Sequence, residues 1–358
     1  MADNPLVSII IPCYNTEDYI SEAIDSALGQ TYPDIEVIVI DDGSEDGSLE
    51  IIKSYGDRIR WETGPNRGAC AARNRGIELA RGEFIQFLDA DDLLLPEKIE
   101  LCLKAFTGDV DVVFSEKKNF GECGTQNNAR PSIFYRILRP FPSVYKGIRS
   151  LYYWPAGGSS KNPLVFFLTH GMQTAQPLHR ASCLRKIGGF REDLPNGHEF
   201  EMHFRLGLSG ARLKKIDTEL VLYRQHSSPS RIQNIGKYII NAINVRYIIY
   251  EQAQKAGVLD KDLRRALANR FANCAKIAYR EGYPDPAIKA YKTARKLTWI
   301  PRTRNTLDAF PYDVIASVLG LGRTERLCKI FPRTHNIPMS RLEKKHPSAY
   351  SGEKVFYE

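Results

Sequence analysis

Hydrophobic residues in the first part of the chain follow two alternating spacings. Val7–Ile11 and Ile35–Ile40 are nearly continuous apolar runs, rich in β-branched residues, which is typical of strands buried on both faces of a parallel sheet. Between them, apolar residues recur every three or four positions over Tyr19–Leu28, and Gly29 follows where a helix is expected to end. The pattern predicts a strand, a helix and a second strand in that order.

The alternation continues to about residue 90. Helical spacing predicts helices over Leu49–Tyr55 and about Ala69–Ala80, and a short apolar run predicts a strand over Glu83–Leu88. Strands and helices that alternate in this way form right-handed crossovers. The sequence therefore predicts an α/β fold with a doubly wound, mostly parallel sheet, whose ligands bind outside the carboxyl ends of the strands.

Polar residues follow three of the predicted strands. They are Pro12-Cys13-Tyr14-Asn15, Asp41-Asp42-Gly43-Ser44 and Asp89-Ala90-Asp91-Asp92. Because the carboxyl ends of parallel strands meet at one edge of a sheet, we expect these segments to share one crevice.

The acidic segment carries the strongest chemical prediction. Neighbouring carboxylates are costly to hold together unless a cation lies between them. Mg²⁺ in proteins characteristically takes one or two carboxylates together with substrate phosphates. We expect one of Asp89 and Asp91 to face a sugar hydroxyl and the other to bind a divalent cation such as Mg²⁺, while Asp92 is predicted to cap the helix that starts near Pro96.

The other two strand ends suit a nucleotide. The ring of Tyr14 offers a stacking surface for a base, and the carboxylate of Asp42 can accept the N3–H of a uracil. Arg73, on the helix before the acidic segment, suits bidentate contact with phosphate.

The pattern is irregular over residues 117–170, which are rich in aromatic and basic residues, and we expect an acceptor-side insertion there, around Tyr152–Trp154. A further helix is predicted to begin near Glu199, with Glu201 in its first turn. Either carboxylate is a candidate general base. His226 is predicted to lie at the metal or the departing diphosphate.

The chain beyond residue 231 is predicted to be helical. Helices are expected over Tyr238–Ala256, Lys261–Arg280 and Pro286–Leu297, within a helical extension over residues 232–335. The last 23 residues, 336–358, form a polar tail that is expected to be poorly ordered.

Composition narrows the class of protein. Acidic and basic residues are interspersed despite a net charge of +8, which argues against a nucleic-acid-binding face. The basic excess lies mainly in the C-terminal helices, where peripheral contact with an anionic membrane surface is an option. Seven scattered cysteines and the lack of a long apolar run predict a cytoplasmic protein, at most peripheral at the inner face of the membrane.

Five segments in this order resemble glycosyltransferase family 2. They are VSIIIPCYN, IEVIVIDDGS, NRGACAARNRG, FLDADD and GGFREDLPNGHEFEMHFRL. The resemblance covers about Pro5–Arg231 and implies an inverting enzyme with a GT-A fold in a domain over residues 1–231. It also implies a nucleotide-sugar donor, most often a UDP-sugar, and a divalent Mn²⁺ or Mg²⁺ ion.

The resemblance also implies roles for individual residues. It places Pro12, Tyr14, Asn15 and Asp42 at the base, Arg73 near the nucleotide, Asp89 at the ribose or donor sugar, and Asp91 on the metal. The family's usual Glu-Asp pair corresponds to His198-Glu199, so Glu199 becomes the expected base, with Glu201 left as an alternative.

The predicted function is inverting transfer of a sugar to a saccharide or lipid-linked acceptor, in surface polysaccharide or glycan biosynthesis. Because His198 replaces an acid of the family, a non-catalytic nucleotide-sugar-binding module stays as the alternative. A dinucleotide-dependent oxidoreductase is disfavoured, since no GxGxxG turn follows the first strand.

Overall fold

The computed structural model describes residues 4–121, 162–169, 172–225, 235–298, 316 and 319–324. Within them, eight strands form one sheet in the order β3-β2-β1-β4-β7-β6-β8-β5. The strands are β1 (Val7–Cys13), β2 (Ile35–Asp41), β3 (Arg60–Thr63), β4 (Phe84–Phe87), β5 (Leu93–Leu94), β6 (Val112–Gly121), β7 (Pro177–Arg180) and β8 (Leu213–Gln225). β3, β2, β1 and β4 are parallel, β7 is antiparallel to both neighbours, and β6 and β8 are parallel to each other. The predicted mostly parallel sheet is confirmed.

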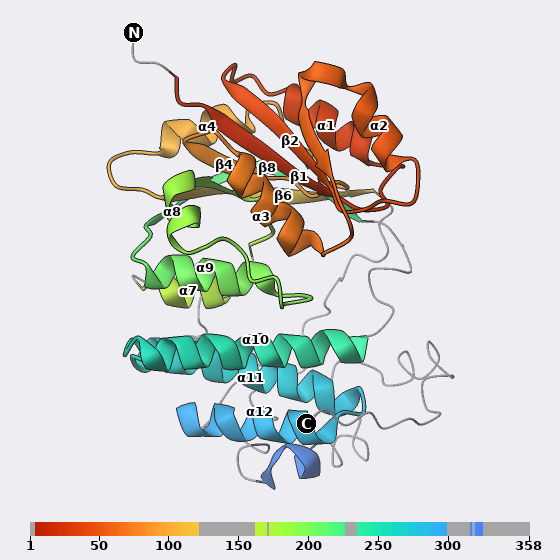
Figure 1. Cartoon of the computed structure of the whole chain (residues 1–358). Helices are drawn as coiled ribbons and strands as arrows, with labels where there is room; N and C mark the ends of the chain where they lie inside the picture. Colours follow the sequence, from red (N-terminus) through yellow and green to blue (C-terminus); the bar gives the residue numbers. More distant parts are fainter. Residues whose placement is uncertain are drawn as a thin grey trace, which may run out of the picture.

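Helices cover both faces of the sheet (Figure 1). They are α1 (Ile20–Leu28), α2 (Ser48–Ser54), α3 (Ala69–Leu79), α4 (Lys98–Ala105) and α8 (Ala181–Lys186). Ile9 and Ile11 of β1 pack with α1, α2 and α4, whereas Ile10 packs with α3 and α8. This two-sided burial explains why the first strand is apolar at nearly every position. Helix α3 approaches β1 closely at Gly76, where an added Cβ would lie 2.3 Å from Cγ2 of Ile10.

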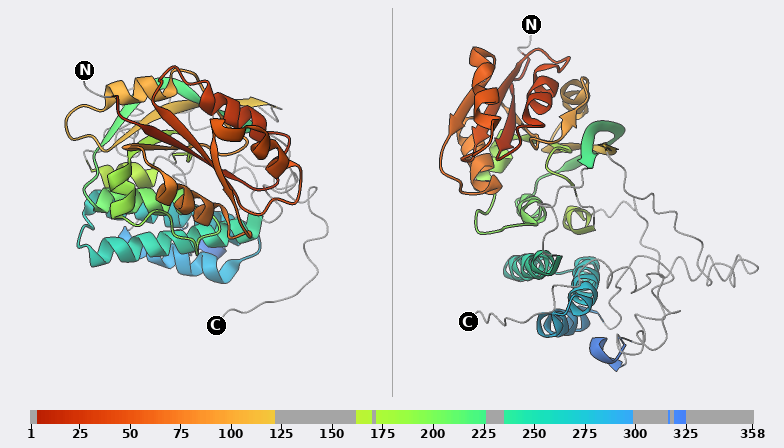
Figure 2. Two further views of the ribbon diagram at one scale, coloured as in Figure 1. Left: turned by 45° about the horizontal axis from the view of Figure 1, so that its top comes forward. Right: turned by 90° about the vertical axis from the view of Figure 1, so that its right-hand side faces the viewer.

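Further layers of helices lie on the α3 side of the sheet (Figures 1 and 2). The nearer layer holds α7 (Pro163–Thr169) and α9 (His198–Leu208), and the outer layers hold α10 (Ile235–Lys255), α11 (Lys261–Arg280) and α12 (Pro284–Leu297). Leu164 and Phe204 of the nearer layer share one buried cluster with Val245, Ile249 and Leu267 of the outer layers. The helical extension therefore packs directly against the helix that carries Glu199.

The predicted insertion over residues 117–170 is wrong at both ends. Residues 117–121 complete β6 and pair with β8, and Pro163–Thr169 forms α7, whose apolar side chains are buried. Residues 117–121 were expected to be irregular because they are polar and partly exposed, and so lack the pattern of a buried strand. Residues 122–161, including Tyr152–Trp154, lie outside the described residues, as does the tail over 336–358. None of the helices in the described ranges is both long and apolar enough to cross a bilayer.

Candidate active site

The ends of β1 and β2 are joined by side-chain hydrogen bonds. The N–H of Asn15 donates to Oγ of Ser44 at 3.0 Å, and Oδ1 of Asn15 accepts the N–H of Glu45 at 2.8 Å. Asn15 has a φ of 49°, a left-handed conformation that asparagine tolerates better than most residues. Pro12 is buried within β1, whereas the ring of Tyr14 is 45% exposed and open to a ligand. Three of the residues predicted to hold the base thus lie together at this edge.

Asp42 also lies at this edge, but its carboxylate already has two partners. Its two oxygens accept the N–H groups of Arg67 and Gly68, each at 2.8 Å, and the residue is only 7% exposed. These bonds fix the loop that leads into α3. A carboxylate has about four acceptor positions, so the arrangement leaves capacity for the N3–H of a base.

Arg73 connects the acidic segment to α9. Its Nη2 donates to Oδ1 of Asp89 at 2.7 Å, and its Nη1 lies 3.0 Å from Nε2 of His198. Its guanidinium lies over the ring of Phe190, with Cζ 5.5 Å from the ring centroid. Arg73 is 5% exposed, so in this structure it holds Asp89 and α9 together from within the protein.

The predicted helix cap at Asp92 is wrong. α4 begins at Lys98 with Glu97 in the cap position, and Asp92 is fully buried with Oδ1 accepting the backbone N–H of Arg224 at 2.9 Å. The cause is a tertiary contact. β8 passes beside the acidic segment, and the backbone N–H of Arg224 requires a hydrogen-bond acceptor there. The side chain of Arg224 donates to the carbonyl of Asp91 and pairs with Glu22.

The metal prediction can be compared only in part with the structure. Asp91 is partly exposed two residues from Asp89, whereas His226 lies outside the described residues. No group of three or more His, Cys, Asp or Glu side chains arranged to hold a metal occurs in the described part of the chain. Asp89 and Asp91 provide the hard oxygen ligands that Mg²⁺ and Mn²⁺ prefer, and one or two such carboxylates suffice where substrate phosphates complete the coordination.

Glu199 lies in the first turn of α9, beside the residue that Arg73 contacts. Its Oε1 lies 3.1 Å from Nε2 of His198 and accepts a hydrogen bond from Oγ1 of Thr174 at 3.2 Å. Burial alone would raise the pKa of Glu199, but the hydrogen bond and charge of His198, with the charge of Arg73, outweigh it and hold the pKa at about 2. Burial alone would lower the pKa of His198, yet Cys70 and Glu199 raise that pKa to about 9. The site therefore holds an ionised carboxylate at neutral pH.

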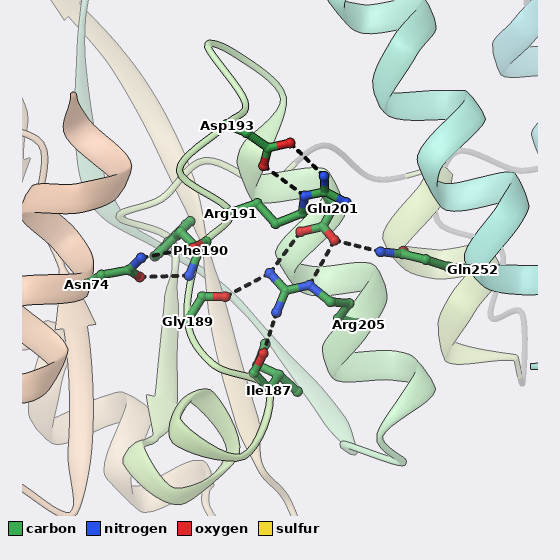
Figure 3. A network of polar contacts seen from close by, with 9 residues as sticks. All are labelled: Asn74, Ile187, Gly189, Phe190, Arg191, Asp193, Glu201, Arg205 and Gln252. Atoms are coloured by element: carbon green, nitrogen blue, oxygen red, sulfur yellow. Dashed lines mark hydrogen bonds and ion pairs between the residues drawn. The ribbon is translucent and has the colours of Figure 1, made fainter. Parts of the chain in front are cut away.

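Glu201, the alternative base, is enclosed by the fold (Figure 3). It is 0% exposed, and its carboxylate accepts Nε and Nη2 of Arg205, both at 2.8 Å, and Nε2 of Gln252 at 2.7 Å. Arg205 in turn donates to the carbonyls of Ile187 and Gly189. Glu201 thus ties α9 to α10 and to the turn after α8, which leaves Glu199 as the better-placed carboxylate.

Three contributors to this site were not predicted. His198 was considered only because it replaces an acid of the family. Thr174 and Phe190 were given no role, although Thr174 contacts Glu199 and Phe190 contacts both Arg73 and His198. Phe190 follows Gly188-Gly189, a pair that is typical of a turn. No periodicity in the sequence indicates which side chains beyond such a turn reach a site.

The His198–Glu199 pair predicts a specific pH dependence of stability. The pKa of His198 is raised, so its contribution is complete below about pH 6.5 and is lost as the pH rises towards 9. The pKa of Glu199 is lowered, so its contribution is complete above about pH 4.5 and is lost as the pH falls towards 2. We expect this pair to contribute about 2 kcal/mol to the free energy of unfolding between pH 4.5 and 6.5.

Urea unfolding of wild type and His198→Gln at intervals from pH 4 to 9 measures this contribution. The difference in free energy of unfolding between the two proteins should be largest near pH 5.5 and should shrink as the pH approaches 9. A difference that stays constant across that range would show that His198 carries no proton-linked stability.

Comparisons with known proteins agree on the family. Residues 8–174 match the model of Glycosyl transferase family 2. The chain is 32% identical over 278 residues to hyaluronan synthase of Pasteurella multocida, which covers 75% of this chain and 26% of the synthase. It is 54% identical over 204 residues to an uncharacterized glycosyltransferase of Rickettsia bellii, which covers 56% of this chain and 27% of that protein. The chain thus spans about a quarter of the length of these two relatives.

Solved structures agree on the fold. TarS 1–349 of S. aureus in complex with UDP-GlcNAc superposes with a TM-score of 0.65 at 17% identity, covering 93% of both chains. The mannosyltransferase PcManGT of Pyrobaculum calidifontis, in complex with GDP-Man and Mn²⁺, superposes with a TM-score of 0.51 at 18% identity, covering 97% of this chain and 89% of that one. The sequence match shows glycosyltransferase family 2 over residues 8–174, and the superpositions show that the fold is similar to that of GT-A glycosyltransferases.

Proposed function

We propose that the protein transfers a sugar from a nucleotide-sugar donor to a hydroxyl group of a saccharide or lipid-linked acceptor, with inversion at the anomeric carbon. The observation that carries this proposal is the placement of Glu199: an ionised carboxylate linked to Asp89 through Arg73 and His198. A base next to a donor-binding edge is what a single displacement requires. The proposal of a UDP-sugar is supported by the UDP-GlcNAc complex of TarS.

The donor would lie across the edge formed by β1, β2 and the acidic segment. In this proposal Tyr14 stacks on the base, Asp42 accepts its N3–H, and Pro12 and Asn15 shape the loop beneath it. Asp89 is held towards the donor by Arg73 and accepts a hydroxyl group of the ribose or the sugar.

Asp91 is the proposed protein ligand of a Mn²⁺ or Mg²⁺ ion, with His226 as a second proposed ligand. The partial exposure of Asp91 beside Asp89 supports this assignment, as does the Mn²⁺ in PcManGT. Such an ion supplies Lewis-acid stabilisation of the charge that develops on the leaving diphosphate.

The reaction itself needs one proton transfer. The acceptor hydroxyl gives its proton to Glu199, and its oxygen forms a bond to the anomeric carbon while the bond from that carbon to the diphosphate oxygen breaks. The electron pair of the broken bond leaves with the nucleoside diphosphate. Thr174, which donates to Glu199, orients the carboxylate for this transfer.

The test is a thermal-shift screen of the full chain with UDP, GDP, UDP-sugars and GDP-mannose, each with Mn²⁺ or with EDTA. A stabilising donor is then assayed for hydrolysis and for transfer to oligosaccharides, and NMR of the product identifies the anomer. Binding without hydrolysis or transfer would favour the alternative, a non-catalytic nucleotide-sugar-binding module. If no nucleotide stabilises the protein, both the transferase proposal and the binding-module alternative are overturned.

We also propose a biosynthetic role and a location in the cell. Relatives named hyaluronan synthase and chondroitin synthase support a place in surface polysaccharide or glycan biosynthesis. Exposed basic residues on α11, such as Lys261 and Arg264, support peripheral contact with the inner face of the membrane in the cytoplasm.

A further inference from the structure

Two arginines of the helical extension lie against the residue that follows the proposed base. Arg246 of α10 and Arg270 of α11 place their guanidinium carbons 5.3 Å and 5.9 Å from the centroid of the Phe200 ring. Phe200 packs with the cluster formed by α7, α10 and α11, whereas Met202 and Leu206 of the same helix pack towards the sheet. The two cations therefore lie on the extension side of α9, against the residue that follows Glu199 in the sequence.

Neither guanidinium has a carboxylate partner among the described residues. Nη1 of Arg246 donates to the carbonyl of Ala242 at 2.9 Å. Arg270 donates from Nε to the carbonyl of Leu168 at 2.7 Å and from Nη2 to the carbonyl of Thr169 at 2.6 Å. The ion pairs found in the described ranges involve other cations, for example Arg73 with Asp89 and Arg205 with Glu201.

This arrangement is costly for the protein alone. Arg246 is only 9% exposed, and burial together with the charge of Arg246 lowers the pKa of Arg270 to about 10. Partly desolvated like charges without a counter-ion destabilise a fold unless an anion joins them. Arg246 is buried and Arg270 is partly exposed, so a ligand would reach the pair from the side of Arg270.

We propose that Arg246 and Arg270 bind an anionic group of the acceptor, a carboxylate or a phosphate, close to the hydroxyl that receives the sugar. Guanidinium groups suit both oxyanions because their paired N–H donors match the oxygens. The inference rests on the proposed function, since it assigns the acceptor to the side of Glu199 that faces the extension. It predicts that the acceptor is anionic and that neutral acceptors of the same length are poor substrates.

Binding is measured first, because it does not depend on turnover. Titration calorimetry of the full chain uses three probes: a tetrasaccharide that contains uronic acid, its carboxyl-reduced neutral counterpart, and a glycerol phosphate oligomer. We expect at least one anionic probe to bind about ten-fold more tightly than the neutral one, and we expect Arg246→Gln to remove this difference. The two anionic probes distinguish a carboxylate from a phosphate.

Matched variants separate this site from structural and donor effects. Arg264→Gln, an exposed arginine of α11 that donates to the carbonyl of Leu259, should leave the binding of all three probes unchanged. Because Arg270 also holds the carbonyls of α7, Arg270→Lys serves as the second variant and should weaken anionic binding while UDP binding stays as in wild type.

Two results would overturn the inference: equal binding of anionic and neutral probes by wild type, or unchanged anionic binding by Arg246→Gln. A loss of UDP affinity equal to the loss of anionic-probe affinity would also overturn it, because the pair would then serve the donor. If anionic binding depends on Arg246 while no nucleotide binds, the anion site stands and the proposed transferase reaction fails.

Discussion

Replacing Glu199 by glutamine should lower kcat by about 10²–10⁴-fold, the range that a positioned general base contributes. The amide keeps the shape and the hydrogen bond from Thr174 but cannot take the proton of the acceptor hydroxyl. Nucleotide affinity should change by less than about three-fold, since an interaction made mainly in the transition state affects kcat more than binding. Steady-state kinetics with the donor found in the thermal-shift screen, together with titration calorimetry of UDP, measure both quantities.

Glu201→Gln is the matched control because it changes a carboxylate of the same helix turn. Its carboxylate is 0% exposed and bound by Arg205 and Gln252, so the amide should lower the free energy of unfolding by about 1–3 kcal/mol. At a temperature where this variant is folded, its kcat should stay within about ten-fold of wild type. The opposite pattern, with Glu199→Gln active and Glu201→Gln folded but inactive, would transfer the role of base to Glu201.

The pKa of Glu199 bears on how this base works. A carboxylate with a pKa of about 2 is fully ionised at neutral pH but is a weak proton acceptor. His198 is a principal cause of that low pKa, so the residue that replaces the family's acid controls the strength of the base. An acceptor hydroxyl that takes over the contact with Glu199 Oε1 from His198 would raise the basicity of Glu199 at the moment of reaction.

The sequence was sufficient for β1, β2 and β4 because local pattern and burial agree there. β1 and β2 are buried on both faces, so their apolar runs appear directly in the sequence. The acidic segment and the loops after β1 and β2 could be placed at one edge because the carboxyl ends of parallel strands meet there. α7 escaped prediction because seven mostly apolar residues cannot be distinguished by periodicity from an irregular apolar run.

The pairings within the site could not be predicted in this way. Arg73 and His198 are 125 positions apart, and Asp92 and Arg224 are 132 apart, so only the folded chain defines these contacts. Arg246 and Arg270 did carry a signal, because each is a charged residue at an apolar position of a helix. A cation at such a position indicates either a buried counter-ion or a ligand, and the sequence alone cannot separate the two.

Replacing Arg73 by methionine should have the second large effect, because Arg73 is the link between Asp89 and the pair that contains the base. Its guanidinium is 6% exposed at the side chain and lies 2.7 Å from Asp89, so its loss leaves a carboxylate without its partner next to Glu199. We expect the free energy of unfolding to fall by about 3 kcal/mol, since breaking an enclosed ion pair leaves an uncompensated charge. We also expect kcat/KM to fall by at least about 10²-fold, because Asp89 and His198 lose their fixed positions.

A second substitution separates the charge effect from the positioning effect. In Arg73→Met/Asp89→Asn the unpartnered charge is removed, so the double variant should recover part of the stability lost in Arg73→Met, as urea unfolding would show. Its kcat/KM should stay low, because neither the acid at the donor nor the link to His198 is restored. Recovery of activity together with stability would mean that Arg73 acts only through the fold, and Asp89 would then have no role at the donor. Recovery of neither would instead point to the lost cation over Phe190, at 5.5 Å from its centroid, as the main contribution of Arg73 to this site.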